Sequence, residues 1–140
     1  MSVPSVFDDV LEFHREMAPH LIGSVPAVPE AGSARLRMRL VAEEYEELER
    51  AIFAGHLPGI ADGVADLVYV AIGVAITYGI DMRPVWAAVH AANLQKANGP
   101  VRADGKIGKP SGWEHPDIAG ILGRQGPLGS EETVDIASTF

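Results

Sequence analysis

An almost uninterrupted apolar segment, residues 67–80, follows directly after an aspartate, Asp66. The segment is too short to cross a bilayer, which requires about 20 apolar residues. It instead favours a helix over residues 60–78 that is buried on most sides. No lysine or arginine occurs between residues 52 and 82. Because an ionised carboxylate in apolar surroundings is costly unless it is paired or bound to a metal, Asp66 requires a partner from outside this helix.

Three further segments show the apolar spacing of helices, and each begins at a residue suited to capping. Ser5, with Asp8 at the capping-box position, is expected to begin the first helix. Ser33 and Asp81 are the expected caps of the second and fourth helices, and Gly79 suits the C-terminal end of the third. The four predicted helices cover approximately residues 6–18, 34–56, 60–78 and 82–97.

The segments between these helices are rich in glycine and proline, and no segment shows the sustained alternation of a strand. We therefore predict an all-α protein with a four-helix bundle-like protomer and a C-terminal loop or arm. Residues 1–118 are expected to form one domain, and residues 119–140 a loosely attached tail.

Composition narrows the classes of function. With 140 residues, of which 47% are hydrophobic, the chain can form one compact core. Its net charge of −8 does not suit a duplex-binding protein, which normally presents a basic face. There is no cysteine, so disulfides and thiolate metal sites are excluded. The N-terminal residues have no basic and apolar regions typical of a secretory signal, and we expect a soluble cytoplasmic protein without a membrane partner.

The second predicted helix contains the acidic stretch "VAEEYEELER", residues 41–50. Positions three and four apart share a helix face, so Glu44 and Glu47 interrupt the apolar stripe that contains Leu40 and Ala51. Glu43 neighbours Glu47 on the same side. The outward positions belong to Glu46 and Glu49.

Asp62 and Asp66 share a face of the third helix in the same way. If the second and third helices pack together, four or five carboxylates converge, and their repulsion requires divalent cations. Ligands that are all oxygen favour Mg²⁺ or Mn²⁺.

A di-iron bundle would need Glu-x-x-His pairs, which this sequence lacks. The competing interpretation of the glutamate-rich stretch is a solvated acidic helix. Tyr69, three residues after Asp66, is placed to border the site.

All three lysines fall in a second, basic region, residues 93–113. Such a Gly- and Pro-rich arm can close over an anion such as phosphate, although a solvated basic loop is the simpler alternative. No Walker A or dinucleotide-binding fingerprint is present. The candidate anion-binding residues are Asn93, Lys96, Arg102, Lys106, Lys109 and Trp113.

Four segments together resemble the all-α nucleoside triphosphate pyrophosphohydrolase superfamily: "RLRMRLVAEEYEELERAI", "IADGVADLVYVAIGVAITYGID", "VHAANLQKANG" and "DGKIGKPSGW". This superfamily includes MazG, the dimeric dUTPases and phosphoribosyl-ATP pyrophosphohydrolase, and the chain is most similar to its small single-domain MazG-like members. The resemblance covers roughly residues 5–117. It implies Mg²⁺- or Mn²⁺-dependent hydrolysis of an NTP or dNTP to the monophosphate and pyrophosphate. It also implies homodimers, or dimers of dimers, that share a nucleotide pocket.

The superfamily motif E-E-x-x-E falls on Glu43, Glu44 and Glu47. The second motif, E-x-x-D, ends at Asp66, but its glutamate position is Gly63, and Asp62 is the expected substitute. The resemblance implies Glu44, Glu47, Asp62 and Asp66 as metal ligands and Glu43 as the base or a ligand of a second metal. It further implies that Asn93 and Lys96 contact the nucleotide and that Lys106, Lys109 and Trp113 belong to a closing arm. Gly63 keeps open an alternative, a non-catalytic helical dimer that binds a nucleotide or a partner.

Overall fold

The fold is helical throughout the described part of the chain. The computed structural model describes residues 4–97 and 99–128, and there the only strand-like pairing is one bridge between Val101 and Ile107. The all-α prediction is therefore confirmed. In chain order the elements are the α-helices and one 3-10 helix (η1), as follows: α1 Val6–Met17, η1 Pro19–Leu21, α2 Ala31–Phe53, α3 Leu57–Thr77, α4 Met82–Leu94 and α5 Ile118–Gly123.

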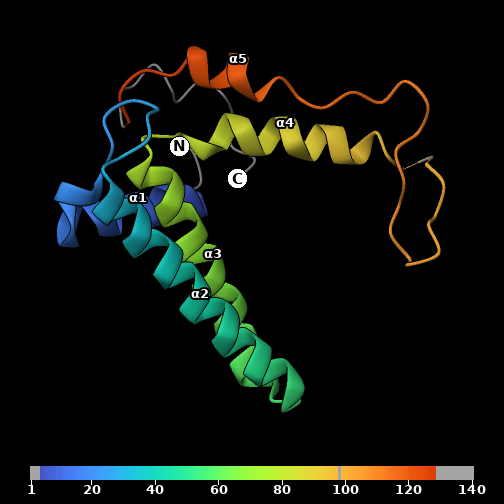
Figure 1. The fold of residues 1–140 in the computed structure, drawn as a ribbon, viewed down its shortest axis with the longest axis horizontal. Coiled ribbons are helices and arrows are strands. Elements are labelled where there is room, and N and C mark those ends of the chain that lie inside the picture. Colours follow the sequence, from blue (N-terminus) through green and yellow to red (C-terminus); the bar gives the residue numbers. More distant parts are fainter. Residues whose placement is uncertain (1–3, 98, 129–140) are drawn as a thin grey trace.

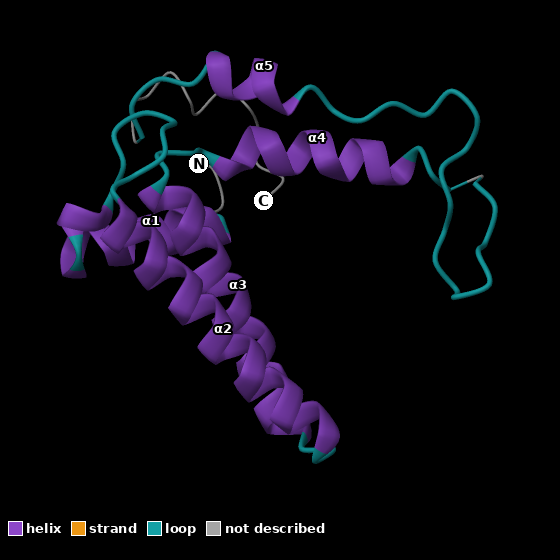
Figure 2. Ribbon diagram, viewed as in Figure 1, coloured by secondary structure: helices purple, strands orange, loops and turns teal. Residues whose placement is uncertain are grey.

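The helices α2 and α3 form a long antiparallel hairpin, and α1 packs against α3 near the open end of that hairpin (Figure 1). From this end α4 leads away in another direction, with α5 returning alongside it (Figure 2). A long loop after α4 lies on the side of the molecule far from α2 and α3. Three of the four long helices, α1, α2 and α3, thus form the body of the molecule, and α4 projects from it.

The helix starts agree with the sequence only in part. Ser5 and Asp8 form the predicted capping box, in which the Asp8 amide donates to the Ser5 hydroxyl at 3.2 Å. The prediction that Ser33 caps α2 is wrong. The carboxylate of Glu30 accepts from the amides of Gly32 and Ser33, at 2.8 and 2.7 Å, and α2 begins at Ala31. The two carboxylate oxygens of Glu30 thus satisfy two of the free N–H groups at the start of α2.

The third helix begins earlier than expected, at Leu57, because His56 caps it by accepting from the amide of Gly59. Pro58 lies in its first turn, where a missing N–H removes no hydrogen bond. The turn before α3 contains Gly55 at φ 63°, and α3 is followed by Gly79 at φ 70°, as its position after the apolar run predicted.

The buried core lies where α1 crosses α3. Phe7, Val10 and Leu11 of α1 pack against Ile72 and Ile76 of α3. Towards the other end of the hairpin the apolar side chains of α3 are exposed in the single chain, so the predicted burial on most sides is not found there. The helix α3 is long and apolar enough to cross a membrane by length and composition alone, a test that core helices of soluble proteins also pass.

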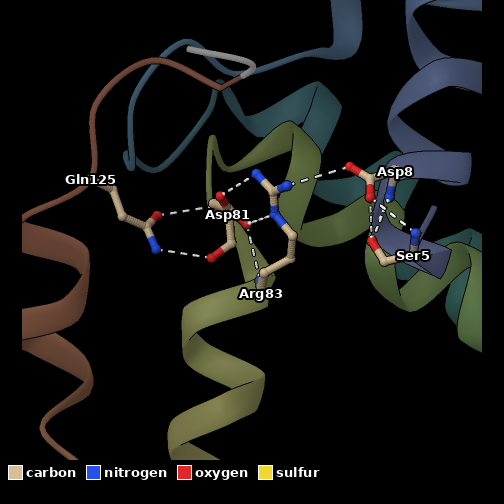
Figure 3. Close-up of polar contacts among 5 residues, drawn as sticks. All are labelled: Ser5, Asp8, Asp81, Arg83 and Gln125. Carbon is tan, nitrogen blue, oxygen red and sulfur yellow. Dashed lines mark hydrogen bonds and ion pairs between the residues drawn. The ribbon is translucent and has the colours of Figure 1, made fainter. Parts of the chain in front are cut away.

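A polar cluster joins α1, α4 and the segment after α5 (Figure 3). Asp81, the N-cap of α4, is 1% exposed and accepts from Nε and Nη2 of Arg83 at 3.0 and 2.8 Å. Arg83 also reaches Asp8 of α1, at 3.5 Å. Gln125 binds both backbone groups of Asp81: its Oε1 accepts from the amide and its Nε2 donates to the carbonyl, at 3.0 and 2.9 Å. This cluster fixes where α4 leaves the body.

The segment predicted as a loose tail is described up to Leu128. Part of it forms α5, and the amide of Leu128 donates to the carbonyl of Ser24 at 3.0 Å. The remainder, residues 129–140, lies outside the described residues.

Candidate metal and nucleotide site

Three carboxylates converge between α2 and α3. Glu44 and Glu47 of α2 and Asp66 of α3 each offer one oxygen, and these three oxygens lie within 4.8 Å of one another. The two glutamates lie on one face because they are three residues apart, and the antiparallel packing of α3 brings Asp66 opposite them. We call these three side chains the carboxylate cluster.

Glu44 has the least favourable environment in the carboxylate cluster. Its Oε2 is buried and has no hydrogen-bond partner among the described residues. Burial raises the pKa of Glu44, and the charges of Glu47, Asp66, Glu43 and Asp62 raise it further. An oxygen that is desolvated, surrounded by negative charge and without a donor is an expensive group for a folded chain to retain.

A divalent cation would offset this cost. Among the described residues, no ion pair with a lysine, arginine or histidine reaches the carboxylate cluster. Ligands that are all carboxylate oxygen suit the hard cations Mg²⁺ and Mn²⁺. The buried Oε2 of Glu44, which has no hydrogen-bond partner among the described residues, supports the fit of this donor set to such an ion.

Glu43 and Asp62, the other predicted acidic site residues, lie at the margin. Both are exposed, and neither belongs to the carboxylate cluster, although both lie near enough to Glu44 for their charges to act on it. Gly63 is buried against α2, and a Cβ added there would lie 3.2 Å from Cα, Cβ and Cδ1 of Leu48. Position 63 therefore serves close helix packing in this chain, and Asp62 is the acidic residue beside it.

Tyr69, which its spacing from Asp66 predicted to border the site, lies against α1. Its ring packs edge-to-face on Phe13 of α1, with 5.5 Å between ring centroids. Burial raises the pKa of the Tyr69 hydroxyl, and the carboxylates of Asp9 and Glu12 raise it further. The surroundings of Tyr69 are thus aromatic and acidic.

The basic arm forms a second cluster, around Trp113. The indole Nε1 donates to the carbonyl of Ala92 at 2.7 Å, which ties the arm to α4. The ammonium groups of Lys96 and Lys109 lie 4.6 and 5.0 Å from the centroid of the Trp113 ring. Lys96 also donates to Oδ1 of Asn93 at 3.1 Å. A cavity of about 290 Å³ beside these side chains is lined by Val89, Ala92, Asn93, Lys96, Trp113, His115, Pro116 and Ile118.

Sequence reasoning missed His115, which completes this basic cluster. Its ring packs edge-to-face on Trp113 at 4.7 Å, and its Nε2 accepts from Lys109 at 3.1 Å. The proximity of His115 to Trp113 along the chain was its only signal. Lys106 and Arg102 lie apart from it in an exposed turn, where Arg102 pairs with Asp104 at 3.6 Å.

Within one chain the two clusters lie on separate parts of the fold. The carboxylate cluster belongs to the α2–α3 hairpin, whereas the basic cluster lies at the end of α4, which points away from that hairpin (Figure 1). A ligand that is held by both clusters at once therefore requires a second chain or a movement of the arm.

The carboxylate cluster falls within the part of the chain that matches a known family. The family model described as phosphoribosyl-ATP pyrophosphohydrolase matches residues 10–93, more than half of the chain. The match ends at Asn93, so the arm that carries Lys109 and Trp113 lies beyond it. No curated protein matches the chain.

Proposed function

The chain belongs to the phosphoribosyl-ATP pyrophosphohydrolase family, whose members are hydrolases that act on a nucleotide-like substrate and release pyrophosphate, and from this premise we propose a specific reaction. The protein hydrolyses a nucleoside triphosphate, NTP or dNTP, to the monophosphate and pyrophosphate with Mg²⁺ or Mn²⁺. The observation that carries this proposal is the carboxylate cluster with the partnerless, buried Oε2 of Glu44.

The proposed roles follow from where the side chains lie. Glu44, Glu47 and Asp66 hold the metal, and Asp62 is an additional ligand at the margin. Bound Mg²⁺ supplies neutralisation of the triphosphate charge and a lowered pKa of coordinated water. Glu43, exposed and outside the carboxylate cluster, is free to take a proton from the attacking water as general base.

The basic cluster is proposed to hold the phosphates, with Asn93, Lys96, Lys109 and Trp113 as substrate-binding residues and Tyr69 at the opposite border. Lys106, in the exposed turn, belongs to the closing part of the arm. Lysine ammonium groups serve phosphate as point charges.

A homodimer, or a dimer of dimers, would bring the basic cluster of one chain to the carboxylate cluster of the next. Apolar side chains near the tip of the hairpin support this assembly, because a single chain leaves them uncovered. Phe53 is 83% exposed and Leu57 is 74% exposed, and Val64 of α3 is also exposed. We place the activity in the cytoplasm, as house-cleaning of the nucleotide pool.

The test is pyrophosphate release from a panel of NTPs, dNTPs and phosphoribosyl-ATP, with Mg²⁺ and with Mn²⁺. Turnover of at least one triphosphate is expected, and Glu47→Ala or Asp66→Ala should abolish it without unfolding the chain. Glu46→Ala is the matched control, because Glu46 is exposed on the same helix and outside the carboxylate cluster. Folded protein that turns over no triphosphate with either metal contradicts the proposal.

Gly63 supports one competing function, a non-catalytic helical dimer that binds a nucleotide. The glutamate expected at this position would have to displace Leu48 from its packing. Calorimetry distinguishes the two functions: nucleotide binding without any pyrophosphate released favours the binding protein.

A further inference from the structure

A cavity of about 320 Å³ opens between α1 and α3, on the side of Asp66 where Tyr69 lies. Its walls are apolar except for a carboxylate and a phenol, and no residue of the carboxylate cluster lines it. The lining residues are Val6, Asp9, Val10, Ala65, Val68 and Tyr69.

The position of this cavity relates it to the proposed reaction centre. Tyr69, which lines the cavity, follows Asp66 by three residues in α3, about 4.5 Å along the helix axis, so the two side chains are neighbours on one side of the helix. A ligand whose phosphates are held at the carboxylate cluster can therefore extend its other end into the cavity.

The chemistry of the cavity decides which end of a nucleotide enters. Asp9 lies at its border and Glu12 lies nearby on the same helix, so the negative charge of the phosphates is repelled. The apolar walls suit a flat, neutral group. A volume near the lower end of the range for ligand pockets, about 300–1,000 Å³, accommodates a base but not a complete nucleoside triphosphate.

We propose that this cavity receives the base of the nucleotide and that Asp9 selects bases that carry an exocyclic amino group over uracil and thymine. This inference rests on the proposed function. An ionised carboxylate only accepts hydrogen bonds, so it pairs with the amino group of cytosine, adenine or guanine. The 4-oxo group of uracil or thymine would place its lone pairs against those of Asp9. Because Asp9 is exposed to solvent, the discrimination is moderate, about tenfold.

Binding of α,β-methylene analogues of dCTP and dUTP, which resist hydrolysis, tests this assignment by calorimetry in the presence of Mg²⁺. The wild-type protein is expected to bind the dCTP analogue about tenfold more tightly. Asp9→Asn should reduce the ratio to within about twofold, because an amide offers both a donor and an acceptor. Glu16→Gln is the matched control: it removes one exposed negative charge from the same helix and should keep the ratio.

A second variant tests the cavity itself. Ala65→Leu places a larger side chain in the cavity and should weaken binding of both analogues about tenfold, with the helical circular dichroism retained. If Ala65→Leu does not fold, the ratio of the affinities of Asp9→Asn for the dCTP and dUTP analogues tests the inference by itself. Equal binding of the two analogues by the wild-type protein, or an unchanged preference in Asp9→Asn, overturns the inference.

These results are separable from the fate of the proposed function. Pyrophosphate release without any preference for amino-bearing bases overturns the role of the cavity and leaves the hydrolase intact. A preference in binding that disappears in Asp9→Asn, without any pyrophosphate released, supports the base cavity and overturns the hydrolysis.

Discussion

Nη2 of Arg37 lies 2.7 Å from Nε2 of His14, and Nε of the same guanidinium donates to the hydroxyl of Thr77 at 2.7 Å. Both side chains are buried, with His14 3% exposed and Arg37 5% exposed. Nδ1 of His14 lies 2.8 Å from the carbonyl of Val10, which can only accept. The hydrogen-bond network therefore assigns the proton to Nδ1 and leaves Nε2 to accept from Arg37. The imidazole must be neutral for both hydrogen bonds to exist.

Acid should weaken the attachment of α1. Burial lowers the pKa of His14 below its usual value of 6.5, and the charge of Arg37 lowers it further. Below about pH 6.5 the unfolded chain therefore binds more protons than the folded chain. The stability that the neutral ring contributes is complete above that pH and is lost as the pH falls through the folded pKa. Urea unfolding between pH 7.5 and 5 should show this loss.

The control for this pH dependence is His14→Gln. Glutamine can donate to Val10 and accept from Arg37 but does not titrate, so the slope between pH 7.5 and 5 should flatten. At neutral pH the variant is expected to lose about 1 kcal/mol, the typical value of one imperfect hydrogen bond. His20→Gln, at an exposed position, should leave the slope unchanged. A slope that persists in His14→Gln assigns the acid sensitivity to another group.

Glu44→Gln should stabilise the protein when no metal is present. Burial and four neighbouring carboxylates raise the pKa of Glu44, so the folded chain binds more protons than the unfolded chain above about pH 4.5. Stability is therefore lost as the pH rises from about 4.5 through the folded pKa, and an amide in place of the charge removes the loss. The melting temperature of Glu44→Gln at pH 7.5 in a chelator should exceed that of the wild-type protein.

Mg²⁺ should reverse that order. A cation that binds only the folded state adds about 2.7 kcal/mol at a hundred times its dissociation constant, and Glu44→Gln has one ligand fewer with which to bind it. Melting temperatures with and without Mg²⁺ measure both effects, and Glu46→Gln is the control that should show the wild-type response. A Glu44→Gln protein that melts below the wild type in chelator would contradict the electrostatic account.

Spacing along one helix was informative because a helical face depends on sequence alone. It predicted that Glu44 and Glu47, rather than Glu46, turn towards α3, and their oxygens do lie within 4.8 Å of each other and of Asp66. Which further carboxylates join them depends on the rotation and crossing of two helices, which spacing does not determine. Glu43 and Asp62 accordingly lie outside the carboxylate cluster.

The burial of Arg37 was not predicted, because it depends on a residue in another helix. Arg37 occupies space that exists only since position 73 is glycine: a Cβ there would lie 2.9 Å from Nη1 of Arg37. Arg37 lies seven residues before Glu44 in α2, and Gly73 lies seven residues after Asp66 in α3. Because the two helices are antiparallel, the alignment that brings Glu44 to Asp66 also brings Arg37 to Gly73. This equal spacing was the feature of the sequence from which the burial of Arg37 could have been predicted. An arginine in a polar helix is otherwise expected in solvent.

Gly63→Glu, which restores the glutamate of the E-x-x-D motif, should destabilise this chain and not raise its activity. A Cβ at position 63 would lie 3.2 Å from three atoms of Leu48, and overpacking of this kind costs about 1–3 kcal/mol. Ala61→Glu, at an exposed position of α3, is the control that should change stability little. Chemical unfolding measures both. Combining Gly63→Glu with Leu48→Ala should cost less than the sum of the two changes, because the second change creates the space that the first requires.

Trp113→Ala should release the basic arm without affecting the hairpin. It removes the indole hydrogen bond to Ala92 and two cation–π contacts, from Lys96 and Lys109, each contributing about 0.5–1 kcal/mol. Trypsin should then cut the arm faster, at Arg102 and Lys106, while the urea midpoint of the body stays near that of the wild type. His115→Phe keeps an aromatic ring against Trp113 and should retain most of the protection. If Trp113→Ala is cut no faster than the wild-type chain, contacts other than those of the indole hold the arm on α4.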